Sequence, residues 1–141
     1  MIVLDTNVLS ALMLDPVDEA VVAWLDHQPR ISIWTTSITL FELRYGIEAL
    51  PAGRRRSRLQ QAVERLLNEK IEHRIAGFDE AAANATAILA ADRRRAGRPG
   101  DLRDGMIAGI IMACHATLAT RNVRHFMDLS IAVVDPWDSR S

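Results

Sequence analysis

The chain opens with a short, uninterrupted apolar run, Met1–Leu4, which ends abruptly at the carboxylate of Asp5. A run this short, with no alternating polar residues, is typical of a parallel strand that is buried on both faces. Helices must then cover both faces of its sheet, so the segment favours an α/β architecture. Asp5 is expected at the carboxyl end of this first strand.

The rest of the sequence alternates predicted strands and helices. A second strand is predicted at residues 31–35, and two more at 117–120 and 131–134. Helices are predicted after Asp5 with Thr6 or Asn7 as cap, from Asp15-Pro16, from Ser37 or Thr39, across residues 59–67, from about Asp79 to Ala96, and from Asp101 onward. This alternation predicts a parallel sheet with right-handed crossovers.

Length and composition predict a single domain over residues 1–141, because 141 residues with 49% hydrophobic side chains suffice for one core. The 17 basic and 18 acidic side chains nearly cancel, so any contact with nucleic acid must be local. The single cysteine, Cys114, is expected to be a small buried hydrophobe. With no signal peptide and no run of ~18 uncharged residues, a cytoplasmic protein with no membrane contact is expected.

Polar side chains follow several of the predicted strands. Asp5 follows the first strand, Glu42 comes soon after the second, and Asn122 follows the strand that begins near Thr117. Functional groups of an open α/β sheet gather at the carboxyl ends of its strands, so these three are expected to share one edge. Asp104 begins the helix before the strand at Thr117, and a helix in that position is expected to start on the far side. Topology alone therefore does not bring Asp104 to the others.

Three ionised carboxylates that meet at one edge would need a cation or would have to take up protons. Two of them 4 Å apart repel by about 4 kcal/mol at an effective dielectric constant near 20. Oxygen ligands suit hard ions such as Mg²⁺ or Mn²⁺, whereas the four histidines and Cys114 show no zinc-ligand spacing. The pattern predicts a magnesium or manganese site.

Each acid also has a purely structural interpretation. Asp5 could cap the helix that follows it. Asp101 and Asp104 have the spacing of a capping box, so Asp104 could bind backbone N–H groups at the start of a helix. Glu42 could be an ordinary surface residue of its helix. The combination of the three favours a functional site.

Five segments in order carry a family resemblance. They are I-V-L-D-T-N-V-L-S at the start, T-S-I-T-L-F-E-L-R-Y-G, D-G-M-I-A, A-T-R-N-V-R-H-F, and V-V-D-P-W near the end. The chain resembles the PIN-domain ribonucleases, specifically the VapC and FitB toxins of bacterial toxin–antitoxin pairs. The likeness runs from Met1 to about Trp137.

The resemblance implies a three-layer α/β/α sandwich around a mainly parallel sheet of four to five strands. It further implies an endoribonuclease whose acidic pocket binds Mg²⁺ or Mn²⁺. Asp5, Glu42 and Asp104 match the acidic positions of the family and would be the metal ligands. A homodimer and a cognate antitoxin that blocks the pocket are implied as partners, with RNA as the substrate.

Asn122 departs from the family pattern. Relatives often have T-R-D where this chain has Thr120-Arg121-Asn122. An asparagine keeps an oxygen acceptor without the charge, so Asn122 could still orient a water in the catalytic site, but a second metal becomes doubtful. The alternative is a catalytically weakened binding module that acts through antitoxin or RNA. The small polar side chains expected beside the ligands are Thr6, Asn7, Ser37 and Thr120.

Arginine clusters are candidates for RNA contact. Arg54, Arg55 and Arg56 form one cluster with Arg58; Arg93 and Arg94 form another with Arg95 and Arg98. Either cluster could guide an RNA backbone toward the acids, or could simply be a solvated helix face. The tryptophans Trp24, Trp34 and Trp137 are expected to anchor the core or an interface, since no basic residues interleave with them.

Overall fold

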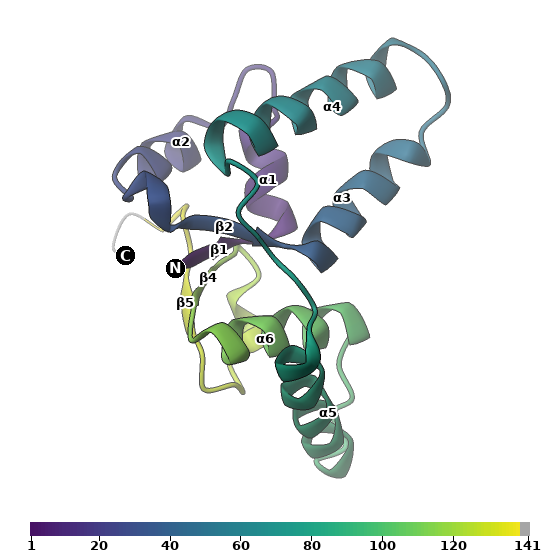
Figure 1. Ribbon diagram of the computed structural model, residues 1–141, viewed down its shortest axis with the longest axis vertical. Helices are drawn as coiled ribbons and strands as arrows, with labels where there is room; N and C mark the ends of the chain where they lie inside the picture. The colour runs from purple at the N-terminus through teal and green to yellow at the C-terminus, as the bar shows by residue number, and fades with distance from the viewer. Residues whose placement is uncertain (139–141) are drawn as a thin grey trace.

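A computed structural model describes residues 1–138 and contains one sheet of five parallel strands (Figure 1). The strands are β1 (Ile2–Leu4), β2 (Ile33–Thr36), β3 (Ile75–Ala76), β4 (Thr117–Ala119) and β5 (Ala132–Val134). Their order across the sheet is β3-β2-β1-β4-β5, so β1 lies in the centre. The predicted sheet of four to five mainly parallel strands is confirmed.

Helices cover both faces of this sheet. They are α1 (Thr6–Leu12), α2 (Glu19–Asp26), α3 (Ser37–Glu48), α4 (Arg54–Arg65), α5 (Glu80–Arg95) and α6 (Leu102–Cys114). Figure 1 shows α1 to α4 on one side and α5 with α6 on the other. Successive residues of β1 serve the two layers: Leu4 packs with α1 to α4, and Val3 packs with α5 and α6. The three-layer α/β/α sandwich is therefore confirmed.

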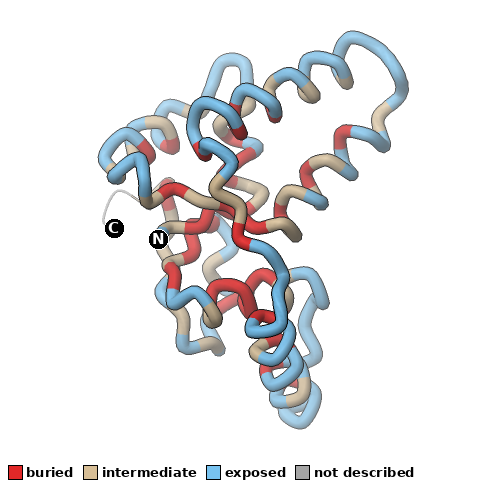
Figure 2. Tube along the Cα trace, in the orientation of Figure 1, coloured by how far each residue is buried: buried red, intermediate tan, exposed pale blue. Residues whose placement is uncertain are grey.

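Three short helical segments complete the chain: η1 (Arg30–Ser32), η2 (Leu66–Lys70) and η3 (Val123–Phe126). The buried residues lie along the sheet and on the inner sides of the helices, while the outer ends of α5 and of the α3–α4 pair are exposed (Figure 2). Among residues 1–138, no helix combines the length and apolar character that a membrane crossing requires.

Several predicted helix starts shift by a few residues. The cap of α1 is Asp5 itself rather than Thr6 or Asn7, and the cap of α3 is Thr36. The helix predicted from Asp15-Pro16 begins only at Glu19, because the Asp18 side chain accepts the N–H groups of Ala20 and Val21. The caps predicted at Asp79 and Asp101 are confirmed.

No local pattern predicts β3, an edge strand of two residues. Its pairing partners are Thr35 and Thr36 of β2, which lie about 40 positions earlier. Two residues are too few to show the alternation by which a strand is recognised. This strand therefore depends on its neighbour in the sheet.

Cys114 corrects another prediction, because it is exposed. It is the last residue of α6, and the chain turns away at His115, which adopts a left-handed conformation with φ of 52°. The tryptophans behave as predicted: Trp24 and Trp137 pack against the core on one side of the sheet, and Trp34 against the other.

Candidate active site

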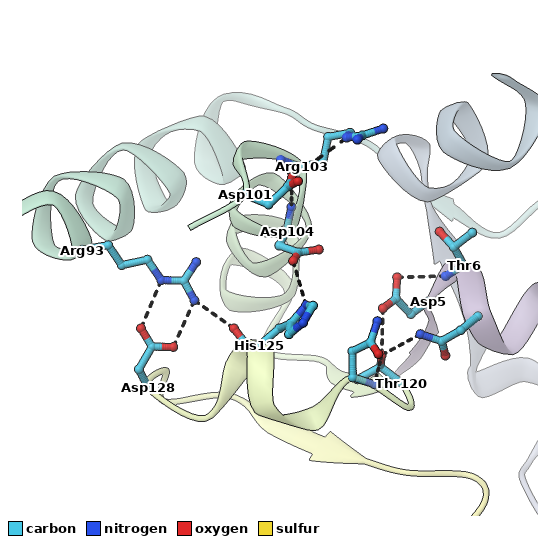
Figure 3. Close-up of polar contacts among 11 residues, drawn as sticks. Asp5, Thr6, Arg93, Asp101, Arg103, Asp104, Thr120, His125 and Asp128 are labelled. Carbon is cyan, nitrogen blue, oxygen red and sulfur yellow. Dashed lines mark hydrogen bonds and ion pairs between the residues drawn. The ribbon is translucent and has the colours of Figure 1, made fainter. Parts of the chain in front are cut away.

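Asp5 lies at the carboxyl end of the central strand and is only 6% exposed. Its Oδ1 accepts the backbone N–H of Thr6 at 2.8 Å, and its Oδ2 accepts the hydroxyl of Thr120 at 2.8 Å (Figure 3). Burial raises the pKa of Asp5, these two hydrogen bonds partly offset that rise, and the charge of Asp104 adds to it. Asp5 is thus both the cap of α1 and a buried carboxylate whose pKa the charge of Asp104 raises further.

The hydroxyl of Thr120 organises the surroundings of Asp5. It donates to Asp5 and accepts from Asn7 Nδ2 and from the backbone N–H of Asn122, both at 3.1 Å. Asn7 Oδ1 in turn accepts the N–H of Arg121 at 3.0 Å. One donated and two accepted bonds exhaust the capacity of a hydroxyl, so the orientation of Thr120 is fully determined.

Asp104 lies in the first turn of α6, and its Oδ2 is 3.1 Å from Nδ1 of His125 (Figure 3). The cap of that helix is Asp101, which accepts the N–H groups of Arg103 and of Asp104 itself. The structural interpretation of Asp104 as a capping residue is therefore wrong. Its carboxylate points instead to a residue that follows β4.

The expectation that α6 starts on the far side of the sheet is also wrong. The helix ends at Cys114, only two residues separate it from β4, and the N–H of Thr117 bonds to the carbonyl of Met1 at the amino edge of the sheet. A helix that finishes at the amino edge and runs antiparallel to the strands must start at the carboxyl edge. Asp104 is consequently close enough to Asp5 to raise its pKa.

Glu42 lies on α3 with 24% of its side chain exposed. Burial raises the pKa of Glu42, and the charges of Asp5 and Asp104 raise it further. Arg103 acts in the opposite direction, with its Nη1 3.9 Å from Oε2 of Glu42. The three acids identified in the sequence therefore lie close enough for the charge of Asp104 to act on both Asp5 and Glu42.

The chemistry of these side chains fits a hard divalent cation. All three offer carboxylate oxygens, and the nearby hydroxyl of Thr6 is buried without a hydrogen-bond partner among residues 1–138. A hydrated ion would provide both countercharge and a partner for that hydroxyl. In this conformation, however, no three His, Cys, Asp or Glu side chains within residues 1–138 lie close enough to hold one ion. The carboxylates would have to draw together, and Glu42 would have to exchange Arg103 for the ion.

The other predicted site residues include Ser37 and the first arginine cluster. Ser37 Oγ accepts the N–H of Phe78 at 3.3 Å and so ties the start of α3 to the segment after β3. Arg54, Arg55 and Arg56 begin α4, at the outer end of the α3–α4 pair (Figure 1). Arg56 pairs with Glu48, with Nη2 and Oε2 3.3 Å apart.

The arginines of the second cluster differ in how far they are buried. Arg94 is exposed, as a solvated helix face would be. Arg93 is only 9% exposed, and its Nε and Nη2 donate to the two carboxylate oxygens of Asp128 at 3.1 and 3.0 Å. Nη2 also donates to the carbonyl of His125 at 3.1 Å. Arg93 therefore joins α5 to the segment that follows β4.

Two residues of the site were not identified from the sequence. The spacing of the histidines argues against zinc but does not predict the contact of His125 with Asp104, although the position of His125 after β4, within R-N-V-R-H-F, places it at the carboxyl edge. Arg103 directly precedes Asp104 and reaches Glu42 across the space between α6 and α3. No local pattern signals either contact, because both join elements distant in sequence.

Comparison with known proteins identifies the family of this chain. The family model described as PIN domain matches residues 2–130. The chain is 36% identical over 138 residues to VapC ribonuclease Y4jK of Sinorhizobium fredii, covering 98% of this chain and 99% of that protein. It is 34% identical over 137 residues to Toxin FitB of Neisseria gonorrhoeae, covering 97% and 99%.

Solved structures show the same fold. The structure of FitAB bound to an IR36 DNA fragment contains a chain that superposes with a TM-score of 0.86 at 33% identity, covering 98% of this chain and 96% of that one. DNA-bound VapBC from Salmonella typhimurium gives a TM-score of 0.81 at 28% identity, covering 96% and 97%. The match in sequence and fold shows that this chain belongs to the PIN domain family.

Proposed function

We propose that the protein is an endoribonuclease that depends on Mg²⁺ or Mn²⁺ and hydrolyses RNA phosphodiester bonds. The observation that carries the proposal is the buried carboxylate of Asp5, held by Thr6 and Thr120 in the field of Asp104 and Glu42. Burying ionised carboxylates together is costly without a cation, and the role of Asp5 as cap of α1 does not require Asp104 and Glu42 beside it. The similarity to a VapC ribonuclease supports the same conclusion.

Different residues of the chain have different roles in the proposed reaction. Asp5, Glu42 and Asp104 would hold the ion, which when bound supplies Lewis-acid activation of water and neutralises charge developing on the phosphodiester. Thr120 and the N–H of Thr6 fix both oxygens of Asp5, so this ligand is oriented before substrate arrives. One of the carboxylates accepts the proton of the attacking water. No protein nucleophile is required.

We also propose that the protein is the toxin of a toxin–antitoxin pair, with a cognate antitoxin as its partner. Its relatives include a toxin, FitB, and its structural neighbours are FitAB and VapBC complexes. A homodimer remains a prediction from the family resemblance. Asn122 is exposed, and only its backbone N–H joins the hydrogen bonds around Thr120.

A cleavage assay with Mg²⁺, Mn²⁺ or chelator tests the proposal. Wild-type protein should cleave RNA only with metal, and Asp5→Ala should lose about 100-fold or more of the rate, because a metal ligand contributes more than the outer residues that support it. Asp26→Ala replaces an exposed aspartate of α2 and serves as the control. Metal-dependent cleavage that survives in Asp5→Ala would refute the assignment.

The variant Asn122→Asp tests how much metal affinity and cleavage rate the chain loses by having an amide in place of the family's fourth acid. A restored carboxylate should tighten Mn²⁺ binding, measured as a larger rise in melting temperature when the ion is added. It should also increase the cleavage rate. RNA or antitoxin binding without cleavage in every variant would instead favour the weakened binding module.

A further inference from the structure

A cavity of about 580 Å³ opens beside the carboxylate cluster. It lies between the end of α5, the start of α6 and the η3 segment, and Asp104 is part of its wall. The other wall residues that matter below are Arg98, Gly100, Arg124, His125 and Met127. The cavity is therefore continuous with the proposed catalytic edge, and it is not used by the chemistry described above.

The acids of the cavity are already engaged. Both oxygens of Asp128 accept from Arg93, and Asp101 caps α6 while lying 4.0 Å from Arg103. By contrast, Arg98 and Arg124 are exposed, and neither forms an ion pair within residues 1–138. Arg98 and Arg124 therefore present positive charge to a ligand at this wall, while the remaining wall carboxylate, Asp104, faces His125.

The cavity is preformed. Arg93 clamps η3 to α5 through Asp128 and the carbonyl of His125 (Figure 3). Gly100 lies directly against that clamp, since a Cβ added there would be 2.9 Å from Nη1 of Arg93. The N–H of Arg98 also bonds to the carbonyl of Arg93 at 2.8 Å, which ties the backbone that carries Arg98 to the end of α5. A backbone held in this way lowers the ordering cost of binding, which favours affinity.

The cavity also presents an apolar surface. Met127 is 73% exposed and lines the wall beside the two arginines. A thioether makes favourable contacts with aromatic rings, and an arginine binds phosphate through charge-assisted hydrogen bonds. A nucleotide combines an aromatic base with a phosphate, whereas an acidic peptide would leave Met127 unused.

We infer that this cavity binds the nucleotide next to the scissile phosphate of a single-stranded RNA, with Arg98 and Arg124 on its phosphate and Met127 against its base. The inference rests on the proposed nuclease function. It assigns RNA binding to this wall rather than to the arginines at the start of α4. It also separates Arg98 from Arg94, which is not part of the cavity wall.

The test compares two double variants, Arg98→Gln/Arg124→Gln in the cavity and Arg54→Gln/Arg55→Gln on α4 as the matched control. The probe is a fluorescein-labelled single-stranded RNA of mixed sequence, titrated in chelator over a range of salt concentrations. The cavity variant should bind about tenfold more weakly for each arginine lost. Its log–log salt slope should fall in magnitude by about 0.7 per arginine, while the control keeps the wild-type affinity and slope.

Three outcomes would overturn the inference. These are wild-type affinity in the cavity variant, equal losses in both variants, or unchanged RNA affinity together with weaker binding of labelled poly-glutamate, which would assign the cavity to an acidic polypeptide. Wild-type cleavage with Mg²⁺ or Mn²⁺ is measured in parallel. If RNA binding depends on the cavity but no cleavage occurs, the proposed nuclease function is refuted and the inference about the cavity is supported. If cleavage occurs but RNA binding does not depend on the cavity, the nuclease function is supported and the inference is refuted.

Discussion

At the scale of single residues, Thr120 matters because its one hydroxyl forms hydrogen bonds with three partners. It connects Asp5 with Asn7 and with the backbone of Asn122, and it is completely buried. Its hydrogen bond also lowers the pKa of Asp5, which burial otherwise raises. Thr120 thus helps to keep a buried carboxylate ionised and oriented.

Replacing Thr120 by valine should therefore weaken catalysis while leaving the fold intact. Valine has nearly the same shape but cannot donate to Asp5, so the pKa of Asp5 should rise further. We expect metal affinity and cleavage rate to fall by about 10- to 100-fold, measured by Mn²⁺ titration and RNA cleavage. Thr120→Ser retains the hydroxyl and should stay close to wild type; equal losses in the two variants would contradict this role.

At the scale of elements, the close packing of α5 on α6 positions the catalytic helix. A Cβ on Gly109 of α6 would lie 1.9 Å from Oγ1 of Thr86 and 2.8 Å from the carbonyl of Ala82, both on α5. Thr86 also donates to the carbonyl of Gly105 at 3.3 Å. Glycine is thus required for the approach of two helices that carry Arg93 and Asp104.

Gly109→Ala should lower the free energy of unfolding by about 1–3 kcal/mol, because the helices must move apart to admit the methyl group. Gly46→Ala on α3 is the matched control, since nothing lies within 4 Å of a Cβ there. The control should gain roughly 0.5–1 kcal/mol from helix propensity. Urea denaturation of both variants measures these changes. A neutral Gly109→Ala would mean that the two helices separate at no cost.

At the scale of the whole molecule, a few side-chain contacts tie the chain's last third to its earlier helices. Arg93 binds Asp128, and the indole N–H of Trp137 donates to Asp18 at 2.8 Å. The guanidinium of Arg121 also lies 4.2 Å from the ring centre of Trp137. Arg93 lowers the pKa of Asp128, through hydrogen bonds above all, and the charge of Arg98 adds to the effect.

The lowered pKa of Asp128 makes part of the stability dependent on pH. A carboxyl group whose pKa is lower in the folded state stabilises the protein above its unfolded value, about 3.9, and loses that contribution as the pH falls through the folded value. Asp128→Asn should therefore cost about 1–2 kcal/mol at neutral pH, less than a fully buried pair because 33% of the Asp128 side chain is exposed.

Denaturant unfolding from neutral pH to below pH 4 would measure this difference. The gap between wild type and Asp128→Asn should narrow as the pH falls, since both then lack the charge. Asp26→Asn, an exposed aspartate with no ion pair among residues 1–138, is the control and should follow wild type throughout. A gap that stays constant with pH would contradict the contribution of the ion pair.

The sequence alone determined what depends on neighbouring residues. An apolar run that ends in Asp5, the caps Asp79 and Asp101, and the alternation of strands with helices are local patterns, and each was recovered in the structure. Sheet topology then placed Asp5 and Glu42 at one edge. Only the family resemblance predicts Asp104 at that edge, because sheet topology alone predicts that the helix carrying it starts on the far side.

The tertiary structure decided what depends on contacts between distant segments. Asn7 and Thr120 are 113 positions apart, Arg93 and Asp128 are 35 apart, and β3 exists only through its pairing with β2. Periodicity and propensity carry no information about such pairs, since they describe only the nearest turns of chain. Burial likewise follows from packing, which exposed Cys114 and buried Arg93 against expectation. The acids can thus be predicted from the sequence, whereas the hydrogen bonds that orient them form only when the sheet brings its strand ends together.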